Sequence, residues 1–371
     1  MHLLHINSYF ATTALYSNLY DRQRAAGLSL TVYVPVAKEC CLEDLACYGQ
    51  EALIHPCFWQ MDRYIFHLKH YKIWHDLKAS VNFEAVDLIH AHSLFSNGWL
   101  AYQAHKKYAI PYVVAVRSAD VRTFFQKLFW LRPLGLNIMK AAQQIVFISR
   151  NTYQEVLENY IPAHFQKAFQ EKAQVIPNGI HDYWHQAAAQ KPRTRLHCPV
   201  RIVCTCKLQK QKEIPRLIQY IQAYNKKVQP AELHIIGPNY DDRILKLIKK
   251  SDHVIYHGPQ NKPGMVEIYQ GMDIFALISS RETFGLVYVE AMSQSLPIIY
   301  TRGEGFDSFM PNHTVGESTD YRSEHEFIEN LDRIIKAYPE RSKAALRASE
   351  QFNWDDIAKT YQKLYEKVLK P

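Results

Sequence analysis

Two glutamates with seven residues between them, Glu282 and Glu290, are the residues most suited to chemistry. They lie in the segment 273–300, where a strand pattern ends near 279 and a helix pattern then runs to 294. Free backbone N–H groups at a helix start bind anions, so this one suits a phosphate or diphosphate. The residues expected to form it are Thr283, Phe284, Gly285 and Leu286. With Glu282 before the helix and Glu290 two turns into it, about 10 Å apart by helical rise, one carboxylate could hold a sugar and the other a ribose.

Two simpler interpretations of the same segment stay open. Glu282 could be a first-turn acid that the helix dipole favours, and Glu290 a solvated helix residue. Gly285 is expected to let a ligand approach the backbone closely.

Short apolar runs alternate with longer amphipathic stretches around this segment, which is typical of parallel strands joined by helices. Strands are predicted at 3–6, 30–35, 88–91, 112–116, 145–148, 201–205, 232–236, 254–256, 274–278 and 297–300. Helices are predicted near 13–26, 96–107, 134–142, 151–159, 213–226, 241–250, 264–270 and 284–294. The fold class is therefore α/β with two Rossmann-like halves, which would place a ligand cleft between the carboxyl ends of two sheets.

The polar, basic segment 184–199 contains Pro192 and Pro199 and is predicted as a linker. It separates an N-terminal domain, 1–183, from a C-terminal domain, 200–353. The chain has 371 residues, which suits two or three domains. Its 47% hydrophobic and 22% charged residues exclude a disordered or collagen-like chain.

The apolar runs are too short for a membrane-spanning helix, and the first residues do not resemble a secretory signal. An odd number of cysteines, seven, without metal-binding spacing suggests reduced thiols and a cytoplasmic location.

Positive charge is concentrated in residues 53–150, which hold 12 Lys/Arg against 5 Asp/Glu, a local charge of +7 within a net charge of +8. Aromatic residues are interleaved with these cations in 58–78 and 124–140. This mixture suits contact with an anionic membrane surface, so we expect the protein to lie peripherally on the inner face of the cell membrane. The alternative is a set of ordinary amphipathic helices that cover a sheet. Nucleic acid is not expected as a partner, because no nucleic-acid-binding motif is present.

The stretch ETFGLVYVEAM at 282–292, followed by Pro297, resembles the donor-site signature of retaining GT-B glycosyltransferases of family 4. Further segments resemble the family in its order along the chain. They are DLIHAH at 87–92 with Gly98, VIPNGI at 175–180, CKLQKQK at 206–212, the glycine turns at Gly237 and Gly258, and the terminal segment 352–369. The resemblance implies a GT-B fold in which the helix 354–371 returns to complete the N-terminal domain.

The resemblance also implies roles for individual residues. Lys207 and Lys212 would grip the donor diphosphate, with Gly237 beside them, and the positive charge of two ammonium groups suits a leaving diphosphate. The alternative is a solvated basic loop. Glu282 would hold the sugar and Glu290 the ribose of a nucleotide-diphospho-sugar. No metal or organic cofactor is expected, because the chain contains no D-x-D motif.

Two departures from the family concern the N-terminal domain. The loop 7–13 lacks glycine, so Ser8 would have to act through its side chain. Arg117 occupies a position where the family commonly has histidine; it could hold an anion, oriented by Asp120, or form a structural pair with Asp120. His90 and His92 alternate on a strand. We expect His92 to reach an acceptor pocket, and a metal site is the less favoured interpretation because no third ligand is evident.

The sequence therefore predicts a retaining, metal-independent glycosyltransferase of hexosyltransferase type. Its acceptor would be a saccharide or lipid-linked saccharide, in cell-surface polysaccharide or glycolipid synthesis. A GT-B nucleotide-sugar epimerase and a catalytically silent glycan- or membrane-binding relative are the alternatives.

Overall fold

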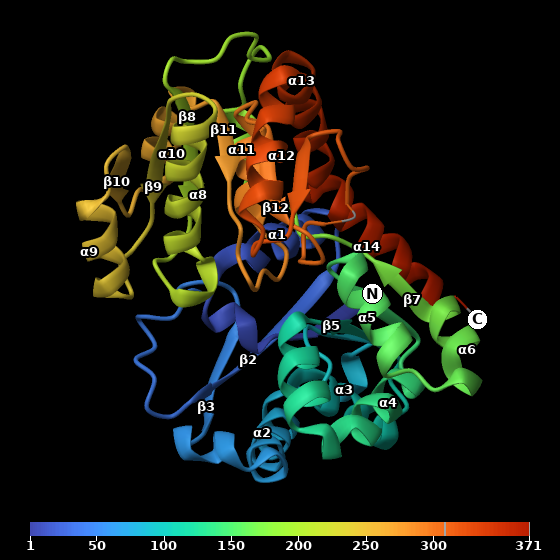
Figure 1. The fold of residues 1–371 in the computed structure, drawn as a ribbon. Helices are drawn as coiled ribbons and strands as arrows, with labels where there is room; N and C mark the ends of the chain where they lie inside the picture. The colour runs from blue at the N-terminus through green and yellow to red at the C-terminus, as the bar shows by residue number, and fades with distance from the viewer. Residues whose placement is uncertain (308, 371) are drawn as a thin grey trace. The chain divides into compact units, whose positions relative to one another are not determined.

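The structure is a computed structural model that describes residues 1–307 and 309–370. The chain forms two compact units (Figure 1). Unit 1 contains Met1–Ile148, Thr152–Pro177 and the C-terminal residues from Trp354 onward, and unit 2 contains Ser149–Asn151 and Asn178–Asn353. Each unit is built on one parallel sheet covered by helices, so the predicted fold class is confirmed.

Unit 1 has a seven-stranded sheet in the order β3-β2-β1-β4-β5-β6-β7, and every pair in it is parallel. The strands are β1 (His2–Ile6), β2 (Ser29–Ala37), β3 (Leu53–Phe58), β4 (Leu88–Ala91), β5 (Tyr112–Val116), β6 (Gln144–Phe147) and β7 (Ala173–Val175). The α-helices are α1 (Ser17–Ala25), α2 (Phe66–Ser80), α3 (Ser96–Tyr108), α4 (Arg132–Ala141), α5 (Arg150–Asn159), α6 (Ala163–Lys172) and α14 (Trp354–Leu369). Short helical turns include η1 (Ser8–Ala11), η3 (Gln60–Tyr64) and a π-helical segment, Asp120–Lys127.

Apolar side chains cover both faces of this sheet, because successive strand residues point to opposite sides. Leu3 and Leu88 pack on one face, against α1 and α14. Leu4 and Ile89, the next residue in each strand, pack on the other face against α2, α3 and α4. Near-continuous apolar runs such as 112–116 are therefore explained by burial on both sides.

Helix α14 completes unit 1 through polar contacts as well as apolar ones. The hydroxyl of Tyr365 lies 2.7 Å from Nδ1 of His90 in β4, and Arg22 Nε of α1 donates to the Asp355 carboxylate at 2.6 Å. Trp354 and Tyr361 are buried with the sheet residues of the same face. The C-terminal segment therefore belongs to the core of unit 1.

Unit 2 has a six-stranded parallel sheet in the order β10-β9-β8-β11-β12-β13. Its strands are β8 (Val200–Thr205), β9 (Ala231–Ile236), β10 (Val254–Gly258), β11 (Ile274–Ala276), β12 (Ile298–Thr301) and β13 (Gly316–Thr319). Its helices are α7 (Asp182–Gln186), α8 (Ile214–Lys227), α9 (Asp242–Lys250), α10 (Lys262–Gln270), α11 (Leu286–Ser293), α12 (Glu324–Lys336) and α13 (Tyr338–Ser349).

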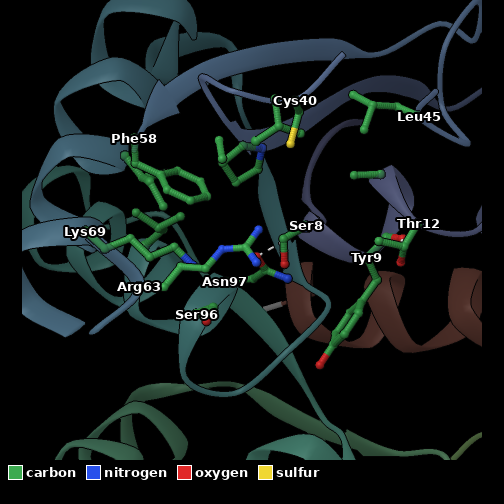
Figure 2. Close-up of a pocket in the computed structure, with 16 residues that line it drawn as sticks. Ser8, Tyr9, Thr12, Cys40, Leu45, Phe58, Arg63, Lys69, Ser96 and Asn97 are labelled. Carbon is green, nitrogen blue, oxygen red and sulfur yellow. Dashed lines mark hydrogen bonds between the residues drawn. The ribbon is translucent and has the colours of Figure 1, made fainter. Parts of the chain in front are cut away.

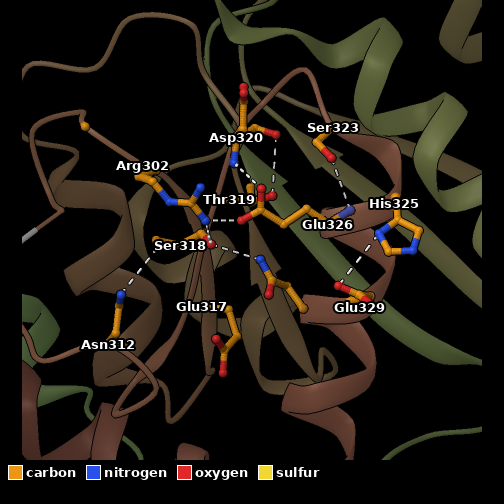
Figure 3. Close-up of polar contacts among 12 residues, drawn as sticks. Arg302, Asn312, Glu317, Ser318, Thr319, Asp320, Ser323, His325, Glu326 and Glu329 are labelled. Carbon is orange, nitrogen blue, oxygen red and sulfur yellow. Dashed lines mark hydrogen bonds and ion pairs between the residues drawn. The ribbon is translucent and has the colours of Figure 1, made fainter.

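The edge of this sheet at β13 is tied to α12 by polar groups (Figure 3). The Ser323 hydroxyl caps α12 by accepting from the Glu326 N–H at 3.2 Å, and Asn330 Nδ2 donates to the Ser318 carbonyl at 2.9 Å. Glu326 also accepts from Arg302, which follows β12. A serine three residues before a glutamate is a capping signal, and here it fixes where the helix begins.

The segment 184–199, predicted as a linker, packs as part of unit 2 instead. Trp184 is buried and stacks on Tyr269 with 5.9 Å between ring centroids. The Arg193 guanidinium donates to the carbonyls of Tyr269, Gln270, Met272 and Gln294. Polar composition suggested a linker, but Arg193 donates to backbone carbonyls of the neighbouring elements, which composition does not reveal.

Candidate functional site

The loop between β11 and α11 brings two of the predicted residues together. Lys212 Nζ donates to Glu282 Oε2 at 2.7 Å, and both side chains are largely buried, with 17% and 13% of their surface exposed. The Ser280 N–H donates to the Gln211 carbonyl at 2.9 Å, which joins the Glu282 loop to the turn that follows β8. A lysine and a carboxylate predicted to contact one donor molecule are therefore in direct contact with each other.

Helix α11 begins at Leu286, two residues later than predicted. Thr283 and Phe284 precede it, and Gly285 is its N-cap with a φ of 81°. Because Glu282 lies outside the helix, helical rise does not set its separation from Glu290. In the described part of the chain, the backbone N–H groups of 284–287 contact no acceptor, so this helix start could receive an anion.

Gly285 has a reason of its own to be glycine. Its positive φ disfavours other residues, and a Cβ there would lie 2.4 Å from the Tyr288 ring. Tyr288 is buried and donates to the Leu277 carbonyl at 2.8 Å. Gly237 is similar, since with its φ of 141° a Cβ would lie 1.9 Å from the Cys206 carbonyl oxygen. Both glycines therefore shape the backbone at the ends of strands, whatever a ligand does there.

A second glutamate, Glu304, supports the Glu282 loop and was not expected from the sequence. Its carboxylate accepts from the Glu282 N–H at 2.6 Å, and the Gly305 N–H donates to the Glu282 carbonyl at 3.2 Å. A Cβ on Gly305 would lie 2.1 Å from the Thr283 carbonyl oxygen. The run Gly-Glu-Gly after β12 was the signal that could have identified this support.

Lys207 follows β8 and lies over an aromatic ring. Its Nζ is 5.4 Å from the centroid of Tyr240, an exposed residue of the loop that follows β9. Lys207 is exposed, and no ion pair with an acidic residue is found for it among the described residues. It is therefore a cation at the carboxyl edge of the sheet that a ligand could engage.

Glu290 is not a solvated helix residue. Burial raises the pKa of its carboxyl to about 7, an effect that Lys262 partly offsets. The carboxyl thus changes its charge near neutral pH, which the sequence did not suggest. No contact joins it to Glu282.

His5, His90 and His92 form a buried cluster in unit 1. Their nearest ligand-type atoms lie within 4.8 Å of one another, and His5 Nδ1 lies 3.0 Å from His92 Nε2. Burial lowers the pKa of all three rings, to about 3 for His5, so they are neutral. His5 supplies the third histidine that the sequence did not identify. His92, expected to reach an acceptor pocket, is enclosed by this cluster and by Tyr16 and Tyr20.

Arg117 and Asp120 also lie inside unit 1. Arg117 Nε donates to the His92 carbonyl at 3.1 Å. The Asp120 carboxylate accepts from the backbone N–H groups of Leu94, Phe95 and Arg117, and burial raises its pKa to about 6. The Arg117 guanidinium also lies over the Tyr16 ring, with 5.9 Å between its central carbon and the ring centroid, so the side chain is packed inside the unit.

Ser8 lines a cavity of about 240 Å³ in unit 1 (Figure 2). The cavity is also lined by Arg63 and Lys69, from one of the two basic-aromatic stretches, and by Asn97. Of the acceptor-side residues predicted, only Ser8 reaches it.

The basic-aromatic stretches expose several large side chains. Tyr64 is 85% and Trp59 50% exposed. Other exposed members are Met61, Ile65, Leu68, Tyr71, Phe129 and Trp130. One face of helix α2 does cover the sheet, through Ile73 and Leu77. For that face, the alternative of an ordinary amphipathic helix is correct.

Two family models match the chain in succession. Glycosyltransferase Family 4 matches residues 15–183, and Glycosyl transferases group 1 matches residues 194–351. The chain belongs to the family 4 glycosyltransferases of GT-B type.

One curated relative is similar over most of the chain. It is alpha-monoglucosyldiacylglycerol synthase of Acholeplasma laidlawii, 26% identical over 306 residues, which are 76% of this chain and 75% of the relative. Further curated relatives are matched over 23% to 54% of their own length.

Solved structures share the fold. Sucrose-phosphate synthase from Thermosynechococcus elongatus has a TM-score of 0.75 at 17% identity, covering 99% of this chain and 98% of that one. Anabaena HepE in complex with UDP and glucose has a TM-score of 0.68 at 15% identity, covering 99% and 100%. Within the described residues, no helix is both long and apolar enough to cross a membrane.

Proposed function

We propose that this glycosyltransferase is a retaining, metal-independent enzyme of hexosyltransferase type. It would transfer a sugar from a nucleotide-diphospho-sugar to a saccharide or lipid-linked saccharide, in cell-surface polysaccharide or glycolipid synthesis. The observation that carries the proposal is the Lys212–Glu282 pair beside the unpartnered N–H groups of 284–287. A cation, a carboxylate and free amides at one strand end match the groups of a sugar diphosphate.

In the proposed reaction, the bond between the anomeric carbon and the β-phosphate oxygen breaks, and the acceptor oxygen bonds to that carbon on the same face. The departing phosphate oxygen takes the acceptor's proton. Lys207, Lys212 and the amides before Tyr288 would stabilise the charge that builds up on the diphosphate. Glu282 would hold sugar hydroxyls, and Glu290 the ribose.

The Lys212–Glu282 ion pair has a consequence for donor binding. Lys212 already has one anion at 2.7 Å, so a diphosphate would bring a second anion to a largely buried lysine. The negative charges of the diphosphate and of Glu282 repel each other, so the Glu282 carboxylate is expected to accept hydrogen bonds from the neutral hydroxyls of the sugar. The pair would hold both side chains in place before the donor arrives, which reduces the ordering cost of binding.

The relatives support the substrate classes. The printed name of the Acholeplasma laidlawii relative describes a glycolipid synthase, and the Anabaena structure holds UDP and glucose. The exposed aromatic residues of 59–71, with Arg63 and Lys69 among them, support a location on the inner face of the cell membrane. The seven unpaired cysteines agree with a reducing compartment.

A donor panel tests the proposal. Each nucleotide sugar is incubated with and without saccharide acceptors, nucleotide diphosphate release is measured, and the anomeric configuration of the product is read by NMR. The expected result is transfer with retained configuration that survives EDTA. Loss of activity in EDTA, restored by Mn²⁺, would contradict metal independence. Interconversion of nucleotide sugars without an acceptor would indicate the epimerase, and binding without turnover the silent relative.

A further inference from the structure

The cavity of unit 1 is built mainly from apolar side chains with a polar corner. It has a volume of about 240 Å³ and lies among η1, the ends of β2 and β3, α2 and the start of α3. Its apolar wall includes Val36, Phe58, Ile73 and Leu100. Arg63, Lys69 and Asn97 form the polar corner together with Ser8, and Figure 2 shows Arg63 reaching toward Ser8 and Asn97.

The two cations at this corner lack acidic partners. Neither Arg63 nor Lys69 forms an ion pair with any residue that the structure describes. Asp62, next to Arg63 in sequence, is held instead by Lys72 at 2.8 Å and by the Trp59 N–H at 2.7 Å. Two positive charges facing a cavity without a counter-ion favour an anionic ligand.

Lys69 is the more enclosed of the two cations. Its Nζ lies 4.6 Å from the centroid of the Phe58 ring. Burial and, next, the charge of Arg63 lower its pKa to about 8. A negative charge beside Lys69 would stabilise its ammonium form, which burial disfavours. An anion is therefore expected to bind more strongly here than beside a solvated lysine.

Asn97 provides an independent sign of a ligand. It is 1% exposed, its Oδ1 accepts from the Ser8 N–H at 3.4 Å, and its Nδ2 has no partner in the described residues. A buried amide donor without an acceptor is costly, so its presence at a cavity wall calls for a ligand acceptor. Asn97 also lies in the first turn of α3, whose dipole favours negative charge there.

We propose that this cavity binds the acceptor substrate through an anionic group, a phosphate ester, which accepts hydrogen bonds from Arg63, Lys69 and Asn97 while the apolar wall packs against the rest of the acceptor. The inference rests on the proposed transferase function and specifies its acceptor. Of these residues Arg63 is exposed, whereas Asn97 is buried.

Kinetics of matched variants test it. Arg63→Gln and Asn97→Asp are compared with Lys127→Gln, which removes one exposed cation of the same basic region outside the cavity. Loss of a charge-assisted hydrogen bond should raise the KM for a phosphate-bearing acceptor about 10- to 100-fold. Lys127→Gln should not change it. Nucleotide release without acceptor should be unchanged in Lys127→Gln.

The outcomes separate the two proposals. Equal KM in the cavity variants and the control, with normal transfer, overturns the anion site and leaves the transferase intact. Absence of turnover with every donor contradicts the proposed function, and the site is then tested by binding alone. For that, the rate of Lys69 acetylation is followed by mass spectrometry with inorganic phosphate or with chloride at equal ionic strength.

Phosphate should slow acetylation of Lys69 several-fold and leave Lys127 unchanged. Equal rates in phosphate and chloride would overturn the anion site. Two further probes identify the source of the phosphate ester. Protection by phosphatidic acid vesicles but not by glycerol 3-phosphate assigns a lipid head group, whereas protection by glycerol 3-phosphate assigns a soluble phosphorylated acceptor. Protection by neither overturns the proposal.

Discussion

The polar residues at the carboxyl ends of the two parallel sheets are arranged in opposite ways. In unit 2, the loops after β8 and β11 bring Lys212 and Glu282 into contact and leave helix-start amides open. In unit 1, the residues after β4 and β5 turn inward, where His92 meets His5 and Asp120 binds backbone N–H groups. The same sheet architecture therefore places the proposed donor residues in contact at the end of one sheet and a cluster of buried polar residues at the end of the other.

This difference shows where to look for the acceptor. The unit 1 residues whose types suggested chemistry contact one another or backbone groups inside the unit. Arg63 and Lys69, which form no ion pair with a described residue, and Asn97, whose Nδ2 has no partner there, come from segments near the sheet edge at β3 and from the start of α3. In unit 2, residues at the carboxyl ends of the central strands form the proposed donor site. In unit 1, the proposed acceptor site is formed instead by residues near the sheet edge and at the start of α3.

The largest effect should come from Glu282 in unit 2. Glu282→Ala should reduce turnover by about 100-fold or more, because it removes hydrogen bonds that strengthen in the transition state. Nucleotide diphosphate should still bind, which isothermal calorimetry can measure. Glu267→Ala, an exposed carboxylate of α10, is the control. Normal turnover in the Glu282 variant would remove this loop from the site.

Glu290 should affect binding rather than turnover. If its carboxylate accepts from the ribose, Glu290→Ala should weaken nucleotide affinity by about 1–3 kcal/mol, or roughly 5- to 150-fold. With a pKa of about 7, the wild-type carboxyl is protonated below that value and charged above it. Nucleotide affinity should therefore rise as the pH increases from 6 to 8, and the variant should lose this rise. A parallel pH profile in both proteins would exclude the ribose role.

The fold was predictable because its buried strands are apolar on both faces. All ten strands expected from such runs are present, whereas β3, β7 and β13 were missed. The sequence of β3, LIHPCF, contains a histidine and a proline, and β7 has only three residues, so neither gives a clear periodic pattern.

The site was predictable where a local motif carries it. The helix start near 284–287 follows from a strand-loop-helix pattern, and the lysines after β8 were singled out by the family resemblance. The Glu304 support and the His5 ring are distant in sequence from the residues they contact, so only tertiary packing shows them. The inward orientation of Arg117 depends in the same way on a carbonyl 25 residues away.

The exposed basic-aromatic surface of unit 1 should bind an anionic membrane, and the surface of unit 2 should not. Each Lys or Arg that engages an anionic membrane contributes about 1 kcal/mol, and salt screens it. Flotation with anionic vesicles should therefore fall at high salt and fall further when Trp59 and Tyr64 are both replaced by serine. Tyr240→Ser, an exposed tyrosine of unit 2, should not change it. Flotation that is insensitive to lipid charge and salt would leave this surface as an ordinary domain face.

The histidine cluster should make unit 1 sensitive to acid. Its pKa values are depressed in the folded state, so the unfolded chain binds more protons below pH 6.5 and stability falls as the pH drops from there toward 3. Each buried histidine contributes up to about 1.4 kcal/mol per pH unit in that window. His5→Gln should make the loss of Tm between pH 6.5 and 5 smaller, while the exposed His325→Gln should not. An unchanged slope in both variants would contradict the neutral cluster.

Arg117→Lys should have the smallest effect and decides which part of this side chain matters. Lysine cannot reproduce the Nε donation to the His92 carbonyl, so the variant should lose about 0.5–1.5 kcal/mol of stability and a few degrees of Tm. Arg195→Lys, an exposed arginine of unit 2, is the control. An anionic ligand bound to the Arg117 guanidinium would instead make the variant lose activity. A tenfold or greater loss of kcat/KM at unchanged Tm would support the role of Arg117 in binding an anion. Unit 1 would then, like the proposed site of unit 2, use a residue at the carboxyl end of its sheet to bind a ligand. A lower Tm with unchanged kcat/KM of the folded protein would establish Arg117 as part of the polar core.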